Sequence, residues 1–420
     1  MHSYYAFLYT RVQRDLGEVP RDVKTLILGI FVYMIAWGVV DPFLSIFIHG
    51  VVKNYSLAGF FYGLFYLMGV FFSMPVGDLA GKVNKVRFIA VSIFSYPLLG
   101  VLYFSLVFVP SWLATMLLFF ARVLHGVASL FWVMADDFIR EKSPKGITSA
   151  TFGLYFTFIK SAYVFAPLVV VPVVIFFGVG IDDAHWLLLA LVPFPVVGAL
   201  IISRISDRGI PFVQGVEEVV LKDHVVRKEF QDLRQLGFVG FFTLLMGFFM
   251  RSIEALIHFL VPLYAFSMGF GLIEISLLFA VINLPYLFSF FFAELADSFG
   301  KVNLISLGFV FAALSLFAIS FSPDLSLTFF FASFSLGLVL AVLFPAVNGL
   351  VTDITPRVND GEMTGLFKTV IKVGSFVSAA AFGVLAELFG LRFPFLFFGV
   401  ILLGMAGLTF FMRSRVVVRI

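Results

Sequence analysis

The chain has 420 residues, of which 61% are hydrophobic, 18% aromatic and only 13% charged, with a formal net charge of +3. Its mean hydropathy is +1.08, which excludes an ordinary soluble globular protein and predicts an integral membrane protein. The sequence contains no cysteine, so disulfides, thiol chemistry and cysteine-based metal sites are excluded. We expect neither a cofactor nor a bound metal.

Apolar segments of about 20 residues, long enough to cross a bilayer, recur along the chain. Residues 1–24 are polar and lack the apolar core of a cleavable signal. Taken in chain order, twelve transmembrane spans are expected at about 25–48, 57–77, 86–109, 112–135, 147–177, 185–204, 236–266, 272–295, 302–321, 326–350, 362–389 and 393–412.

The stretch 203–235 is long, polar and mixed in charge, and it divides six spans from six. We therefore expect an amino-terminal bundle (1–202), a linker (203–235) and a carboxy-terminal bundle (236–420). Apart from Lys53 and Arg392, the basic residues outside the spans fall on one side of the membrane. The positive-inside rule makes that side cytoplasmic, so both termini and the linker are expected in the cytoplasm of a cell-membrane protein. Topology explains these basic residues, and no nucleic-acid partner is expected.

Two short motifs occur once in each half. GLYFTFIK at 153–160 returns as GLFKTVIK at 365–372, and GDLAGKVNKV at 77–86 matches AELADSFGKV at 293–302. The two matches have nearly the same offset, and each places a motif at the same point of a six-span unit. The sequence therefore predicts a duplicated six-span repeat.

The second of these motifs resembles the signature G-x-L-A-D-R-x-G-R-K of the major facilitator superfamily. Gly81 and Asn84 stand where the family has an aspartate and a glycine, and we expect Asn84 to keep the left-handed turn of that glycine. The residues that match the signature are Gly77, Leu79, Ala80, Lys82 and Lys85 in the first copy and Leu295, Ala296, Asp297, Gly300 and Lys301 in the second. The resemblance implies a gating role for Gly77, Lys82, Lys85, Asp297, Gly300 and Lys301.

The fourth span is also similar to a family element. Arg122, His125 and Gly126 resemble R-x-x-Q-G, whose arginine governs a coupling carboxylate in proton-coupled relatives. In the fifth span, only Pro167 remains of the glycine-rich element typical of drug antiporters. The resemblance implies an all-α membrane protein with two pseudo-symmetric six-helix bundles, working as a monomeric, proton-coupled secondary transporter by alternating access.

Charged residues inside the spans are the main functional signal. Each lysine or arginine at the bilayer centre costs roughly 2.5–3.5 kcal/mol, so such residues are expected to face a partner or a water-filled cavity. Helical spacing places Thr157 beside Lys160, Thr369 beside Lys372, and both Glu254 and His258 beside Arg251. We expect these faces to converge on one central cavity that contains five cations: Arg122, Lys160, Arg251, Lys368 and Lys372.

The five cations exceed the two expected cavity carboxylates, Asp41 and Glu254, which predicts an anionic group on the cargo. With 59 phenylalanines in the chain, the rest of the lining is expected to be apolar, so the cargo is predicted to be a small amphipathic organic anion. The residues expected to bind it are Lys160, Lys372, Lys368, Arg251, Trp37, Thr157, Thr369 and His258. The residues expected to couple transport to protons are Asp41, Arg122, Glu254 and His125.

Several alternatives remain open from the sequence alone. Arg251 and Glu254 could form a purely structural pair within one helix, His125 could be a packing residue, and Lys368 could extend toward the interface. Proton-driven export of lipophilic compounds and movement of lipids are rival functions. An enzyme is not expected, because the spans lack H-E-x-x-H and G-x-S-x-G elements.

Overall fold

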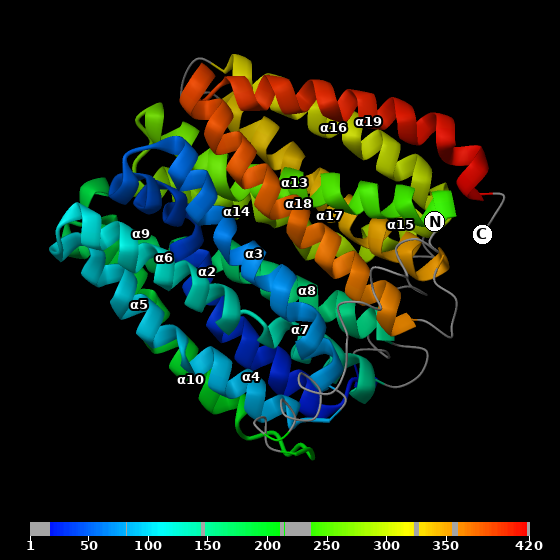
Figure 1. Cartoon of the computed structure of the whole chain (residues 1–420), viewed down its shortest axis with the longest axis horizontal. Helices are drawn as coiled ribbons and strands as arrows, with labels where there is room; N and C mark the ends of the chain where they lie inside the picture. Colours follow the sequence, from blue (N-terminus) through cyan, green and yellow to red (C-terminus); the bar gives the residue numbers. More distant parts are fainter. Residues whose placement is uncertain are drawn as a thin grey trace.

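The computed structural model describes residues 17–80, 82–143, 148–210, 214, 237–322, 327–354 and 360–417. Eleven helical segments in these ranges are long and apolar enough to cross a membrane, and a shorter apolar segment, Leu272–Phe288, accompanies them. Together they form the twelve crossings expected from the sequence, arranged as two bundles side by side (Figure 1). The predicted linker lies largely outside the described residues.

The amino-terminal bundle contains six crossings, several of them built from two consecutive helices. They are α2 (Arg21–Val52), α3 (Tyr55–Ala80), α4 (Lys85–Phe94) with α5 (Tyr96–Ser105) and η1 (Leu106–Phe108), α6 (Ser111–Ala128) with α7 (Phe131–Lys142), α8 (Thr148–Phe165) with α9 (Pro167–Phe177), and η2 (Ile181–Leu191) with α10 (Pro193–Ile202).

The carboxy-terminal bundle repeats this plan. Its crossings are α13 (Gly237–Ser267), α14 (Leu272–Asn283) with η3 (Leu284–Phe288) and α15 (Ser289–Phe299), α16 (Lys301–Phe321), α17 (Leu327–Ile354), α18 (Asp360–Phe389) and α19 (Phe393–Val417).

The expected spans agree with these helices to within a few residues at most ends. The largest difference is the fourth span, expected to end near 135, because α7 continues to Lys142 in a polar, amphipathic turn beyond the apolar stretch. Proline explains several internal breaks, since it donates no backbone hydrogen bond. Pro97, Pro167 and Pro285 lie in the first turn of α5, α9 and η3 respectively.

The two ends of the bundle differ in charge. We call one end the basic end, because α2, α4 and α16 begin there at or near Arg21, Lys85 and Lys301. We call the other the far end; the cations there are Lys53, after α2, and Arg392, between α18 and α19.

The two halves meet closely along α3 and α18 (Figure 1). A Cβ atom on Gly59 would lie 2.3 Å from the carbonyl oxygen of Ala379, and one on Gly383 would lie 2.4 Å from that of Tyr55. Only glycine allows the backbones to approach this closely. At the far end of this seam the Tyr55 backbone amide donates to Glu387 Oε2 at 2.6 Å. α2 also contacts α13, and α8 contacts α14, η3 and α15.

The two copies of the signature loop have different backbones. Gly300 has a positive φ of 85°, a backbone conformation that favours glycine. The prediction that Asn84 forms the same turn is wrong, because its φ is −67°. Asn84 instead caps the amino terminus of α4: its side-chain oxygen accepts from the Arg87 amide at 2.7 Å, and its side-chain amide donates to the Asp207 carbonyl at 2.8 Å.

Candidate functional site

A group of charged side chains lies where the two halves meet, and we call it the central cluster. It consists of Asp41 from α2, Lys160 from α8, and Arg251, Glu254 and His258 from α13. The spacing of the three α13 residues places them on one face, as the sequence predicts. Two backbone features occur beside it: Pro42 follows Asp41, and Pro262 lies one turn beyond His258, so each removes a hydrogen bond from its helix.

Asp41 is buried and receives hydrogen bonds from three sides. The hydroxyls of Tyr62 and Tyr163 donate to its carboxylate at 3.3 Å and 3.2 Å. His258 Nδ1 lies 2.5 Å from Asp41 Oδ2. The histidine comes from the opposite half, so this contact joins the two bundles and disappears whenever they separate at this level.

Glu254 forms the second link between the halves. Its Oε1 atom is 3.3 Å from Lys160 Nζ, and its Oε2 atom accepts from Arg251, three residues earlier on α13. Arg251 and Glu254 therefore form the pair within one helix that the sequence allows, and that pair also binds a lysine of the other half. One carboxylate serves two cations here.

Aromatic faces cover the two cations of this link. Lys160 Nζ lies 4.8 Å from the ring centre of Tyr286 and 5.7 Å from that of Tyr163. The guanidinium of Arg251 lies 4.7 Å from the ring centre of Phe344. Its Nε atom is buried without a hydrogen-bond partner. Both cations thus lie against aromatic rings, and Arg251 keeps at least one N–H donor without an acceptor.

The two lysines of α18 have different partners. Lys368 Nζ pairs with Asp136 Oδ2 of α7 at 2.5 Å, which is a further ionic link between the halves. Lys372 Nζ donates to the hydroxyl of Ser73 and lies 3.5 Å from the Gly69 carbonyl, both on α3. Lys372 thus uses neutral acceptors where Lys368 uses a carboxylate.

Arg122 has a different environment from the one that the sequence suggests. It donates to the backbone carbonyls of Phe61 and Tyr62 at 2.9 Å and 2.5 Å, and so fixes α6 to α3. Its link to Asp41 is indirect, through Tyr62. The difference arises because a guanidinium has five donors and carbonyls of a closely packed neighbouring helix can satisfy them.

His125 and Trp37 belong to the same interior of the amino-terminal bundle. Arg122 lies 3.0 Å from His125 Nδ1, and the imidazole stacks on the Trp37 ring with centres 4.5 Å apart. Trp37 donates to the Tyr33 hydroxyl at 2.5 Å. These side chains are enclosed by partners of their own bundle, which favours the packing alternative for His125.

The remaining predicted residues lie at the edges of the site or outside it. Thr157 is half-buried one turn before Lys160, and the Thr369 hydroxyl is buried without a partner. Among the signature residues, Lys85 pairs with Asp137 at 2.6 Å and with Glu141, both on α7. Gly77 lies within α3, and Lys82 lies in the turn before α4. The Cε atom of Lys301 lies 2.9 Å from the position that a Cβ on Gly349 would take. The side chain of Asp297 lies outside the described part of the chain.

Sequence reasoning missed several partners that complete the site. Tyr163 lies three residues after Lys160 on α8, and Tyr62 lies on the face of α3 that meets Asp41. Asp136 lies on the helical stripe that begins at Arg122, but its position near the end of a span favoured an interfacial residue over a site residue. Adding Asp136 changes the charge count to three carboxylates for five cations.

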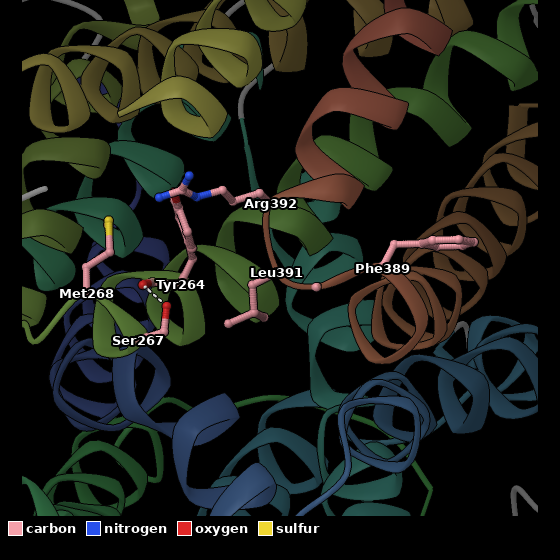
Figure 2. Close-up of a pocket in the computed structure, with 7 residues that line it drawn as sticks. Tyr264, Ser267, Met268, Phe389, Leu391 and Arg392 are labelled. Atoms are coloured by element: carbon pink, nitrogen blue, oxygen red, sulfur yellow. Dashed lines mark hydrogen bonds between the residues drawn. The ribbon is translucent and has the colours of Figure 1, made fainter. Parts of the chain in front are cut away.

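At the level of the central cluster, charged side chains of the two halves contact each other directly in this conformation. The hollow described by the structure has a volume of about 610 Å³ and lies at the far end, where α13 and α18 finish (Figure 2). The residues that line this hollow do not include any residue of the central cluster.

Comparison with known proteins agrees with this architecture. The family model described as Major Facilitator Superfamily matches residues 26–292 and again 284–419. The chain belongs to the Major Facilitator Superfamily. A protein of Methanocaldococcus jannaschii named an uncharacterized MFS-type transporter is 25% identical over 389 residues, covering 90% of this chain and 94% of that protein.

Solved structures of Major Facilitator Superfamily transporters share the fold at low identity. A POT family transporter in complex with a thioalcohol-conjugated peptide superposes with a TM-score of 0.72 at 12% identity, covering 94% of this chain and 97% of that one. The inward-open xylose transporter XylE from E. coli gives 0.67 at 14% identity, covering 92% and 95%. The human organic anion transporter MFSD10 gives 0.61 at 12%, covering 93% and 100%. These likenesses show the fold; the family match and the apolar helices show a multi-pass membrane transporter of this superfamily.

Proposed function

We propose that this superfamily member is a proton-coupled secondary transporter that moves a small amphipathic organic anion by alternating access, as a monomer in the cell membrane with cytoplasmic termini. The two halves rock about the central cluster, so that the cluster is open to one side of the membrane and then to the other. The observation that supports an anionic cargo is the shortage of carboxylates around Lys160, Arg251 and Lys372.

The cations of the central cluster, and the neighbouring Lys372, are incompletely neutralised by the protein. Glu254 is shared by Lys160 and Arg251, Lys372 donates to a hydroxyl and a carbonyl, and the Arg251 Nε atom has no acceptor. Buried cations require a counter-charge and acceptors. A carboxylate or sulfonate on the cargo would provide both, and the rings beside Lys160 and Arg251 would contact its apolar part. The human relative in fold is itself named an organic anion transporter.

The Asp41–His258 contact supports coupling to protons. Asp41 Oδ2 and His258 Nδ1 lie 2.5 Å apart, close enough for a proton to pass between them, and the two residues belong to opposite halves. Separation of the halves removes the histidine from Asp41 and admits water to this pair, and histidine is the side chain best suited to exchange protons near neutral pH. The transport cycle would therefore load and release a proton at this pair. Arg122 acts only indirectly, by holding Tyr62 in place.

Binding of anions is tested by thermal stability of the purified protein with panels of anionic and cationic amphipathic metabolites. We expect organic anions to raise the melting temperature of the wild type and of a Lys24→Gln control, whose lysine is exposed on α2. The shift should vanish in the Lys160→Ala, Lys372→Ala double variant. Stabilisation by cations alone would contradict the proposal and favour export of lipophilic cations.

Proton coupling is tested in proteoliposomes with an imposed pH gradient. The wild type and an Asp183→Asn control, altered at an exposed acid of η2, should concentrate an anion that was found to bind. The Asp41→Asn variant should bind that anion and fail to concentrate it. Accumulation by Asp41→Asn at the wild-type level would remove Asp41 from the mechanism, and lipid movement independent of pH would favour a scramblase.

A further inference from the structure

The hollow at the far end is separate from the central cluster and is built by two chain segments. Tyr264, Ser267 and Met268 come from the last turns of α13, and residues 389–392 come from the end of α18 and the turn into α19 (Figure 2). Gly390 has a φ of 83°, which lets the chain turn sharply there. The hollow therefore joins the ends of the two helices that carry Arg251 and Lys372.

Arg392 provides the free polar group of this hollow. The ion pairs formed within the described ranges do not include it, and its side chain is exposed. The neighbouring hydroxyls already donate within the protein: Tyr264 to the Ser322 carbonyl at 3.3 Å, and Ser267 to the Tyr264 carbonyl at 2.7 Å. In the view of Figure 2 the arginine side chain extends away from the turn and toward Tyr264. A guanidinium with unused donors is suited to bidentate binding of an anion.

The surroundings of Arg392 are apolar and exposed. Its backbone carbonyl accepts from Ser320 at 3.3 Å, so the end of α16 lies beside it. The next residue of α16, Phe321, is 73% exposed, and Leu388 and Phe389 are 67% and 61% exposed. In a membrane protein such side chains meet lipid, and the walls of the hollow include Met268 and Leu391. A ligand here would meet one cation beside an apolar surface.

We propose that this hollow binds a membrane phospholipid, with the phosphodiester group held by Arg392 and the glycerol and upper acyl chains lying against Met268, Leu391 and Phe389. One arginine balances one negative charge, which matches a phosphodiester better than a doubly charged phosphomonoester. The bound lipid ties the end of α13 to the α18–α19 turn and stiffens the carboxy-terminal bundle beneath the central cluster. This site does not depend on the identity of the transported cargo.

The experiment measures lipid binding to the full-length protein in detergent, by native mass spectrometry and by the shift in melting temperature. The probes are phosphatidylglycerol, diacylglycerol, which lacks the phosphate, and inorganic phosphate, which lacks the chains. We expect phosphatidylglycerol alone to bind and stabilise. Arg392→Gln should weaken its binding about tenfold or more, as expected for loss of a charge-assisted hydrogen-bonding pair. Arg392→Lys should retain part of it.

Two further variants keep the test decisive. Lys53→Gln removes the other far-end cation and should bind phosphatidylglycerol like the wild type. Leu391→Trp fills the hollow without changing charge and should reduce binding. Wild-type binding in both Arg392→Gln and Leu391→Trp would overturn the proposal. An equal shift in melting temperature with inorganic phosphate would show that the site binds a free anion and not a lipid. An equal shift with diacylglycerol would show that the phosphate group has no role.

Discussion

The link between Lys160, Glu254 and Arg251 makes an asymmetric prediction about stability. Replacing Glu254 by glutamine leaves two cations without their carboxylate, whereas replacing Lys160 by methionine leaves a complete Arg251–Glu254 pair. The two single variants therefore differ in cost although each removes one partner of the same contact. In the double variant only Arg251 remains uncompensated, so it should be more stable than Glu254→Gln alone.

The magnitude follows from the geometry. Opposite unit charges 3.3 Å apart, the Lys160–Glu254 distance, interact by about 5 kcal/mol at an effective dielectric constant near 20. Removal of one partner of a buried pair costs about 3–5 kcal/mol, because it leaves a buried charge. We expect Glu254→Gln to lie in that range, Lys160→Met to cost about 1 kcal/mol, and the double variant to recover at least about 1 kcal/mol. For 420 residues, about 0.9 kcal/mol corresponds to one degree in Tm.

The assay compares the melting temperatures of the four proteins in one detergent, with Asp183→Asn as a control for loss of an exposed acid. The expected order is wild type, Lys160→Met, the double variant and then Glu254→Gln, with a difference of several degrees between first and last. Strictly additive effects would show that Lys160 and Glu254 do not interact. A Glu254→Gln variant as stable as the wild type would refute the view that Glu254 neutralises both cations.

Three further predictions concern other contacts. Gly59→Ala should lower the free energy of unfolding by about 1–3 kcal/mol, because its Cβ would lie 2.3 Å from a backbone oxygen. The control Gly404→Ala should leave stability unchanged, because its Cβ would have nothing within 4 Å. Equal melting temperatures of the two variants would contradict the close approach of α3 and α18. Asn84→Ala should lower the free energy of unfolding by about 1 kcal/mol and Asn84→Gly by only a few tenths, because Asn84 caps α4. A glycine variant that melts above the wild type would contradict this capping role and indicate that a left-handed turn is preferred there. In a double-mutant cycle, Asp136→Asn and Lys368→Asn should show a coupling free energy of about 1 kcal/mol. Additive shifts in melting temperature would show that the two side chains do not form an ion pair.

The sequence was sufficient for the fold because its signals are strong and local. A span such as α16 has 21 residues, most of them apolar, and the lipid environment requires its backbone hydrogen bonds to be made within the helix. Two repeated motifs then fixed the division into halves. The end of α7 was less predictable, since an amphipathic helix can continue past the membrane without any apolar signal.

The site was only partly predictable, because helical spacing tells which residues share a face but not which face of another helix meets them. The spacing placed Arg251, Glu254 and His258 together, and the structure agrees. It could not assign His258 to Asp41, because that contact joins residues 217 positions apart. The same limit applies to Arg122: the sequence assigned it to proton coupling but could not show that it binds carbonyls of α3.

The polar links between the halves occur at different depths, and this ordering bears on how the two bundles could exchange conformations. Tyr55–Glu387 lies at the far end and Lys368–Asp136 lies toward the basic end, with the central cluster between them. Opening at one end needs to break only the links on that side. Each broken ion pair needs water or another charge in its place. An anionic cargo at Lys160 and Arg251 would supply that charge at the centre, and so lower the cost of separating Glu254 from the opposite half.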